Sequence, residues 1–212
     1  MKFTKFLWLF LSIILASTVL LTACGDISKK DSESTELISK DQEISGEDGG
    51  ISWSLKNGVL TFSGKGKMTD YKYDSKPWKA YIVSIKKVVI EDGIESIGND
   101  AFSYCVNLKD VSIPDSVTSI GKMAFENCES LGSITIPDSV TTIGESAFCF
   151  CLSLKDITIP DSVTSIAKFA FSGCDILKDI YFNGPIPRWN AFGFNECKIP
   201  DSITVHCTDG DI

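Results

Sequence analysis

Five of the eight cysteines are spaced 23 residues apart, and the first chemistries that such a pattern suggests are metal binding and disulfide formation. Stacked repeats lie about 4.8 Å apart, with equivalent side chains parallel. A straight column does not bring sulfurs to about 2.3 Å from one zinc ion, nor does it make Cβ atoms face each other for a disulfide. We therefore expect no metal, and buried free thiols that act as small apolar side chains. The column is Cys105, Cys128, Cys151, Cys174 and Cys197. Cys149 and Cys207 lie outside this column, and one of them could form a disulfide or be an exposed thiol.

Other residue types offer little catalytic chemistry. The chain has one histidine, His206, and one arginine, Arg188, so most general-base and phosphate-binding schemes lack their parts. No nucleophile–base pair and no glycine-rich phosphate loop is visible. Aspartates recur at 110, 156 and 179, but Ser133 interrupts them, and calcium needs six to eight oxygens around one point. We expect neither an enzyme nor a cofactor.

The charge balance restricts the possible partners. The formal net charge is -8, with 28 acidic residues against 20 basic ones, nearly all of them lysines. An acidic surface of this kind disfavours nucleic acid, whose phosphates attract basic proteins. A protein or glycan partner is therefore expected.

The N-terminus has the pattern of a targeting segment over residues 1–23. Lys2 and Lys5 precede an apolar run from Phe6 to Leu21, which is the order of a secretory signal. The sequence Leu-Thr-Ala-Cys at 21–24 is similar to a bacterial lipobox. The resemblance implies cleavage before Cys24 and lipid attachment to it, with acyl chains enough for a stable membrane anchor. A plain signal peptide or an uncleaved anchor is the alternative.

Two further segments separate this signal from the repeats. Residues 24–50 are polar and lack aromatics, which predicts a flexible tether. Residues 51–87 are expected to form a cap that begins with a β-hairpin around Asn57-Gly58, because both turn positions of a two-residue hairpin need positive φ. That register pairs Leu55 with Leu60 and Trp53 with Phe62. Their common apolar face, together with Trp78, would cover the open end of the repeats.

The repeats themselves occupy residues 88–212 and predict a β-rich solenoid. The coils are set at 88–110, 111–133, 134–156, 157–179 and 180–202, and a terminal strand begins at Ile203. A period of twenty to thirty residues is typical of coils that stack and share one core. The structural ladder consists of one phenylalanine and one cysteine from each coil. Its members are Phe102, Phe125, Phe148, Phe171, Cys105, Cys128, Cys151 and Cys174.

The repeat resembles the BspA-like, treponemal type of leucine-rich repeat. The residues that carry the likeness are Ile-Pro-Asp-Ser-Val-Thr-Ser-Ile at 113–120 and 159–166, then Ala124-Phe125, Cys128 and Leu131. The match covers about 88–179, and the region from about 180 is similar to a divergent C-terminal cap. The resemblance implies a leucine-rich repeat fold on a secreted or surface-attached bacterial protein, in a family associated with adhesion.

The outward positions of the strands are the candidate binding face. Five coils at about 4.8 Å would offer only a few hundred Å², less than the roughly 800 Å² per partner of a standard interface, so affinity should be weak. The residues are Asp110, Ser112, Ser133, Thr135, Asp156, Thr158, Asp179 and Tyr181.

These features together predict a lipid-anchored protein-binding or adhesion module. Its head would be extracellular, on the outer face of the bacterial membrane, with the anchor at Cys24. The alternative is a structural envelope lipoprotein that binds a partner of the same cell and has no role in adhesion to a host.

Overall fold

A computed structural model describes residues 43–192 and 203–212, all within one compact unit, Glu36–Ile212. The predicted signal segment and Cys24 lie outside these residues, as does Cys197. No helix within the described ranges is long and apolar enough to cross a membrane.

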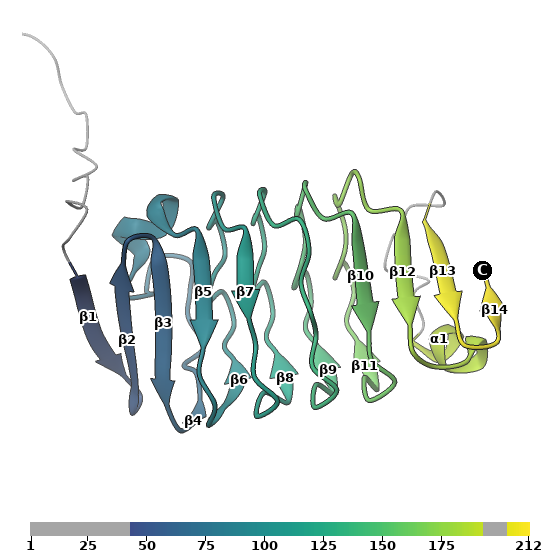
Figure 1. Ribbon diagram of the computed structural model, residues 1–212, viewed down its shortest axis with the longest axis horizontal. Helices are drawn as coiled ribbons and strands as arrows, with labels where there is room; N and C mark the ends of the chain where they lie inside the picture. Colours follow the sequence, from purple (N-terminus) through teal and green to yellow (C-terminus); the bar gives the residue numbers. More distant parts are fainter. Residues whose placement is uncertain (1–42, 193–202) are drawn as a thin grey trace, which may run out of the picture. The chain divides into compact units, whose positions relative to one another are not determined.

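The chain forms a β-solenoid with short strands on two sides (Figure 1). Within residues 43–192 and 203–212, helical structure is limited to a 3-10 helix at Lys79–Ser84 and to α1 at Ile186–Ala191. The strands are β1 (Glu43–Asp48), β2 (Ile51–Lys56), β3 (Val59–Gly64), β4 (Gly66–Lys67), β5 (Lys87–Ile90), β6 (Ile94–Ile97), β7 (Asp110–Ser112), β8 (Ser119–Ile120), β9 (Thr142–Ile143), β10 (Asp156–Ile159), β11 (Ser165–Ile166), β12 (Asp179–Phe182), β13 (Thr204–Cys207) and β14 (Gly210–Asp211).

The predicted coil spacing is confirmed by the strands. β7, β10 and β12 begin at Asp110, Asp156 and Asp179, and β5 begins one period earlier, at Lys87. β5 pairs with β7 and β10 with β12, both parallel, while the coil between them contributes a single bridge, Thr135 to Thr158. Parallel pairing follows because every coil returns to the same edge before it starts its next strand.

A second row of short strands runs behind the first, in the order β11-β9-β8-β6-β4. The Ile-Pro-Asp-Ser turn leads into these strands, and proline ends the preceding ladder since it has no N–H. Serine hydroxyls of this turn donate to the coil before, as from Ser139 Oγ to the Val117 oxygen at 2.6 Å and from Ser162 Oγ to the Val140 oxygen at 2.8 Å. The repeated Asp-Ser-Val segment therefore fastens each coil to its neighbour.

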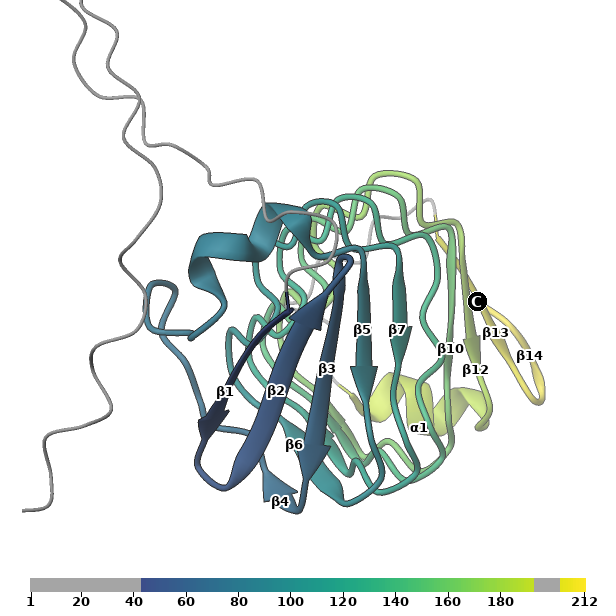
Figure 2. The same cartoon turned by 60° about the vertical axis from the view of Figure 1, so that its left-hand side comes forward.

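The predicted hairpin is confirmed in its register, with Leu55 opposite Leu60 and Trp53 opposite Phe62. Asn57 and Gly58 both have positive φ, at 53° and 78°, as a two-residue turn of this kind requires. β3 then pairs in parallel with β5, so the hairpin continues the first row of strands at the N-terminal end (Figure 2).

The prediction that the tether extends to residue 50 is wrong from Glu43 onward. β1 pairs antiparallel with β2 along its whole length, and Ile44 packs against the core. The Tyr71 hydroxyl donates to Asp48 at 2.5 Å and holds the β1–β2 turn. The polar composition of this segment did not reveal the strand, because its stability comes from backbone pairing with β2 and not from its own side chains.

The core is one cluster that continues from β2 to β13, with the phenylalanine ladder along its middle. Phe125 stacks on Phe148 at 5.4 Å between ring centroids, and Phe148 on Phe171 at 5.7 Å, each pair tilted by only 3°. Towards the N-terminus Phe102 is tilted by 27° against Phe125 and contacts Trp78 and Phe62. The ladder thus passes from repeated stacking to the mixed aromatic packing of the hairpin region.

At the other end the repeat pattern changes as the drift of the sequence predicts. α1 follows β12 and places Trp189 against Phe182, with ring centroids 5.6 Å apart. β13 pairs in parallel with β12, and β14 closes a short antiparallel hairpin on β13.

Candidate binding face

The predicted binding residues lie side by side on the outer side of the first row of strands, which we call the strand face. In the register of the parallel strands Asp156 lies beside Asp179, and Thr158 lies between Thr135 and Tyr181. Most of these side chains are exposed and Asp179 is half-buried, while the residues between them, such as Ile157 and Ile180, are buried. The alternation of a strand therefore brings the eight predicted residues to one surface.

The strand face is longer than the five predicted coils, because β1, β2, β3 and β13 add to it. One line of equivalent positions runs along it, and we call it the central row. Neighbours in this row are directly paired, except Ser112 and Thr135, which lie one 23-residue period apart. Its members are Ser45, Ser54, Thr61, Val89, Ser112, Thr135, Thr158, Tyr181 and His206. Most are small hydroxyl residues, so the middle of the face is flat and polar. At about 4.8 Å per strand the row is roughly 40 Å long.

The C-terminal end of the central row carries an aromatic pair. Tyr181 is 43% exposed, and its ring stacks on that of His206 with centroids 4.8 Å apart and a tilt of 16°. The two nitrogens of His206 lie 2.9 Å from an Asp179 oxygen and 3.0 Å from an Asp211 oxygen. The hydrogen bond to Asp179, followed by the contribution of Asp211, raises the pKa of His206.

His206 is not among the residues predicted for the binding face. A lone histidine in a divergent terminal strand has no repeat that reveals its direction. The sequence would have placed His206 beside Tyr181 only if it were known in advance that β13 pairs with β12.

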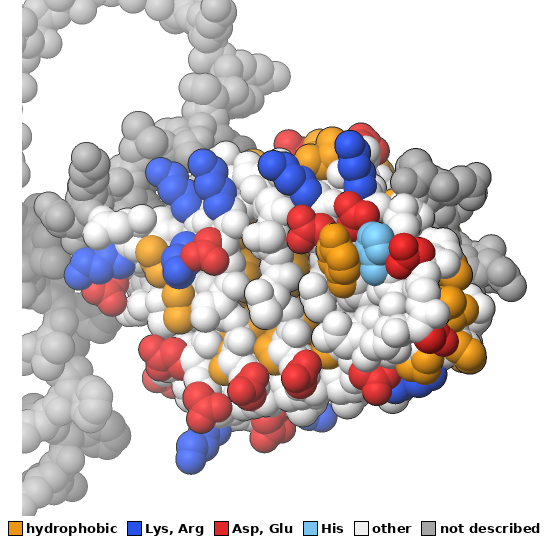
Figure 3. Space-filling view, turned by 45° about the vertical axis from the view of Figure 1, so that its right-hand side comes forward, with side chains coloured by type: hydrophobic (Ala, Val, Ile, Leu, Met, Phe, Trp, Pro, Cys, Tyr) orange, Lys and Arg blue, Asp and Glu red, His pale blue; other side chains and the backbone are white. Residues whose placement is uncertain are grey.

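Two charged stripes border the strand face (Figure 3), where lysines follow the upper margin and acidic side chains the lower one. We define the lysine stripe as Lys86, Lys109, Lys155 and Lys178, which precede the strands and are all exposed. We define the aspartate stripe as Asp92, Asp115, Asp138 and Asp161, which lie in the turns after the strands and are also exposed. Lateral backbone bonds connect neighbouring lysines, from the N–H of Lys109 to the Lys86 oxygen and from that of Lys178 to the Lys155 oxygen.

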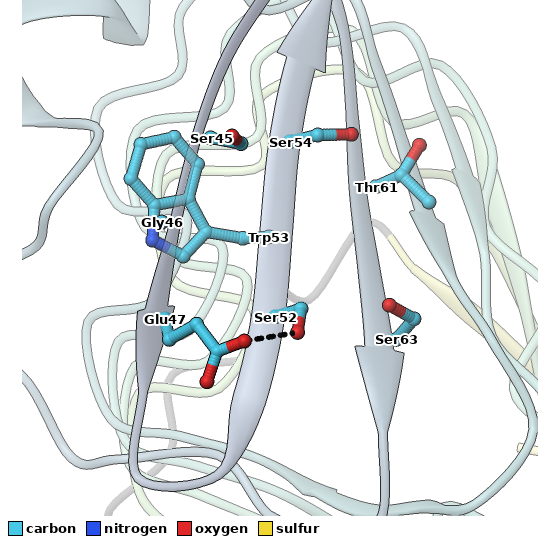
Figure 4. A pocket seen from close by; sticks show the side chains of 8 residues that line it. All are labelled: Ser45, Gly46, Glu47, Ser52, Trp53, Ser54, Thr61 and Ser63. Carbon is cyan, nitrogen blue, oxygen red and sulfur yellow. Dashed lines mark hydrogen bonds between the residues drawn. The ribbon is translucent and has the colours of Figure 1, made fainter.

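A shallow cavity lies at the N-terminal end of the strand face (Figure 4). It has a volume of about 300 Å³ and is lined by Ser45, Gly46, Glu47, Ser52, Trp53, Ser54, Thr61 and Ser63. The Trp53 ring covers Gly46, where a Cβ atom would come within 2.9 Å of it. Small-molecule sites are concave and mostly apolar, whereas this lining is largely serine and threonine.

The predicted cysteine ladder is buried, and its thiols are free. Three of them also donate weak hydrogen bonds to carbonyls of the preceding coil. Cys128 Sγ lies 3.3 Å from the Phe102 oxygen, Cys151 Sγ 3.3 Å from that of Phe125, and Cys174 Sγ 3.1 Å from that of Phe148. Cys149 and Cys207, whose state the sequence left open, are free as well.

Burial controls the acidity of the ladder thiols. Desolvation raises the pKa of Cys105 to about 12 and that of Cys174 to about 12, and it raises the pKa of Cys128 and of Cys151 well above the ordinary value. Since the thiolate is the nucleophile and metal ligand, these thiols are inert at neutral pH. Among the described residues no cluster of three or more potential ligands could hold a metal ion.

The hairpin region completes hydrogen bonds that the first coil leaves open. Within the repeats, N–H groups of one coil donate to carbonyls of the next, as from Phe102 to Ala124. The first coil has no coil before it, and its carbonyls at Asn99, Ala101 and Ser103 accept from the Tyr71 N–H, from Trp78 Nε1 at 3.0 Å and from Lys76 Nζ at 2.7 Å. Buried carbonyls need such partners. These contacts support the capping role predicted for 51–87.

Lys76 was not expected at such a position. Its side chain is buried, with 2% exposed, and its ammonium donates to the carbonyls of Asp100 and Ser103 and to the Ser103 hydroxyl. Desolvation lowers the pKa of Lys76. The sequence offered no signal, because a lysine in a polar stretch usually extends into water.

The sequence model of one protein family, described as "BspA type Leucine rich repeat region", matches residues 80–201 with 6 copies of the repeat. No curated protein is significantly similar in sequence.

Solved structures with the same coil architecture include two that are about 30% identical to this chain over the aligned part. A leucine-rich repeat protein from Eubacterium ventriosum is 31% identical, with a TM-score of 0.55, over 67% of this chain and 44% of its own. A leucine rich cell surface protein from Faecalibacterium prausnitzii is 30% identical, with a TM-score of 0.55, over 70% of this chain and 42% of its own. The pneumococcal vaccine antigen PcpA, 24% identical with a TM-score of 0.54 over 76% of this chain and 44% of its own, shares the fold. The chain therefore spans less than half the length of these relatives.

Proposed function

Because the chain belongs to the BspA type leucine rich repeat family, we propose that it is a cell-surface module that binds another protein through its strand face. The solenoid of this family is in general a scaffold for protein interactions and not for catalysis. One relative with this architecture is described as a cell surface protein, which supports the same location for this chain.

The observation that carries the proposal is the long strand face, to which the two sheets β1-β2-β3-β5-β7 and β10-β12-β13-β14 contribute. Its central row is flat, and Tyr181, exposed at one end of it, is of a residue type enriched in protein interfaces. A partner strand or loop would meet hydroxyl groups along the row and carboxylates from Asp156, Asp179 and Asp211 beside the aromatic pair. With three residues per strand the face covers roughly 400 Å², so one contact is weak and many copies on a surface would act through avidity.

We also propose that Cys24 carries the lipid anchor and that the chain is held on the outer face of the bacterial membrane. The lipobox-like sequence at 21–24 supports this, together with a polar segment long enough to keep the solenoid away from the bilayer. Adhesion is the expected outcome of binding. The alternative, a structural role with a partner of the same cell, has the same anchor and the same face.

The experiment is capture of proteins and glycans by the unit Glu36–Ile212, using arrays of extracellular-matrix proteins, glycans and the bacterium's own envelope. The test variant carries Asp156→Lys and Tyr181→Ala, which change the strand face without touching the core. The matched control carries Glu129→Lys and Phe150→Ala, an exposed acid and an exposed aromatic outside the strand face.

Binding to a foreign protein that only the test variant loses would establish adhesion through the strand face. Binding only to the bacterium's own envelope would favour the structural role. Binding that survives the test variant but not the control would contradict the proposed face.

A further inference from the structure

Within the described part of the chain, seven of the eight residues of the two charged stripes form no ion pair. No carboxylate among the described residues forms an ion pair with any of the four lysines of the lysine stripe. In the aspartate stripe only Asp161 is paired, with Arg188, while Asp92, Asp115 and Asp138 are exposed and unpaired in the described structure. Other exposed charges of the same face, such as Lys87 and Asp110, do pair with each other at 2.6 Å. The stripes are therefore available to an external partner.

The stripes are placed symmetrically about the central row. In the coil of β7, Lys109 precedes Ser112 by three residues and Asp115 follows it by three. The same spacing holds for Lys86 and Asp92 about Val89, and for Lys155 and Asp161 about Thr158. Each of these coils thus has a positive end and a negative end at equal distances from the middle of the face.

This arrangement makes the face complementary to itself under one rotation. A two-fold axis along the central row reverses the strand direction and keeps the order of the coils. Lys86, Lys109 and Lys155 of one copy then meet the aspartates of the same coils in the other copy, which are Asp92, Asp115 and Asp161. Lys178 and Asp138 have no such counterpart, because Gly184 and Gly132 stand at the opposite positions of their coils. An axis parallel to the strands would instead place lysine on lysine, which is repulsive. Two-fold pairs use the same patch on both subunits, as this geometry requires.

We propose that two copies of the chain pair face to face about this axis, with the lysine stripe of each copy against the aspartate stripe of the other. The small side chains of Ser112, Thr135 and Thr158 let two sheets approach to about 10 Å, within reach of lysine. The face with its stripes measures roughly 800 Å², which is the size of one side of a standard interface.

Two further features favour a second copy as the partner. The rotation keeps the coil order, so β1 of both copies lies at the same end of the pair, which agrees with the proposed anchoring of both copies in one membrane. It also brings Tyr181 of each copy to the same end of the axis, where the two aromatic pairs can meet. The pairing goes beyond the proposed function, and it would compete with another protein for the strand face.

The pair should be weak and sensitive to salt. Exposed ion pairs are screened and contribute little each, which limits the dissociation constant to the order of 0.1–1 mM in solution. Copies confined to one membrane would exceed that concentration locally.

A charge-swap experiment tests the pairing. The unit Glu36–Ile212 contains every described buried residue and is studied by sedimentation equilibrium. An acidic variant carries Lys86→Glu and Lys109→Glu, and a basic variant carries Asp92→Lys and Asp115→Lys. The control has the same change in net charge as the acidic variant. It carries Lys72→Glu and Lys168→Glu, at two exposed lysines outside the strand face.

The expected result is dimerisation of the wild type and of the control in about 0.05 M salt, and its loss in about 0.5 M salt. Each charge variant alone should associate at least about tenfold more weakly, because like charges then meet across the axis. An equimolar mixture of the two variants should regain the wild-type association as a heterodimer.

A wild type that stays monomeric at about 1 mM, an acidic variant that dimerises as well as the wild type, or a mixture that does not regain association would each overturn the pairing. None of these results bears on the capture of another protein, which is measured separately with Asp156→Lys and Tyr181→Ala.

Discussion

Alkaline pH should destabilise the fold through its buried thiols. Cys105 and Cys174 are buried in the ladder, and each has a pKa of about 12 in the folded chain, against an ordinary value of 9.0. Between these values the unfolded chain loses protons that the folded chain keeps. The unfolded state then binds fewer protons, so the free energy of unfolding falls as pH rises through about 9.

The size of the effect follows from the two pKa values. At about pH 10 a thiol with this shift lowers the free energy of unfolding by about 1.4 kcal/mol relative to neutral pH, and the two together by about 3 kcal/mol. That is a substantial part of the free energy of unfolding of an ordinary domain, which is about 5–15 kcal/mol. Lys76 acts in the opposite direction, because its pKa is lowered in the fold.

The assay is urea unfolding of the wild type and of a variant with Cys105→Ala and Cys174→Ala, at about pH 7, 9 and 10 with a reductant present. The variant is less stable at neutral pH, because each replacement leaves a small cavity. The informative quantity is the difference between the two proteins in how the free energy of unfolding changes with pH. The contribution of Lys76 cancels in this difference, because both proteins contain it. The wild type should lose about 3 kcal/mol more than the variant between pH 7 and 10. Equal losses would show that the ladder thiols are not protected as the burial implies.

Three other changes test the ends, the core and the anchor. Lys76→Met should lower the free energy of unfolding by about 1–3 kcal/mol in urea titration, because the buried Ser103 carbonyl loses its donor, and an unchanged midpoint would contradict the capping contact. Phe125→Ala should cost about 3–5 kcal/mol by calorimetry or urea, as it opens a gap between two stacked rings, and a cost below about 1 kcal/mol would mean that the ladder collapses around it. Cys24→Ala should move the protein from the membrane to the soluble fraction in cell fractionation, and globomycin should block processing of the wild type. Membrane retention of a processed Cys24→Ala chain would argue against lipid anchoring.

The sequence predicts the repeated part of this fold well, and the reason is physical. A residue that recurs every 23 positions occupies the same place in every coil, so Phe125, Phe148 and Phe171 report one environment three times. The Asn57-Gly58 turn is equally readable, because few residues other than asparagine and glycine accept the backbone that it needs.

The ends of the solenoid were harder to predict. β1 is held by backbone bonds to β2, which leave no mark in the composition of its polar sequence. Lys76 satisfies a carbonyl that is open only because no coil precedes the first, a property of the three-dimensional stack and not of the local sequence. The aromatic pair of Tyr181 and His206 depends in the same way on which strand lies beside β12.

The near-identical stacking of Phe125, Phe148 and Phe171 has a genetic consequence. A coil inserted between them would meet the same ring on both sides, at the same separation and tilt, and would leave the hairpin and α1 unchanged. DNA that encodes such coils can misalign during replication or recombination and gain or lose one repeat unit in frame. Each event would lengthen or shorten the solenoid by about 4.8 Å, and the product would still fold because every coil packs only against its neighbours. The length of the solenoid can therefore change in whole coils, by copying of the DNA alone.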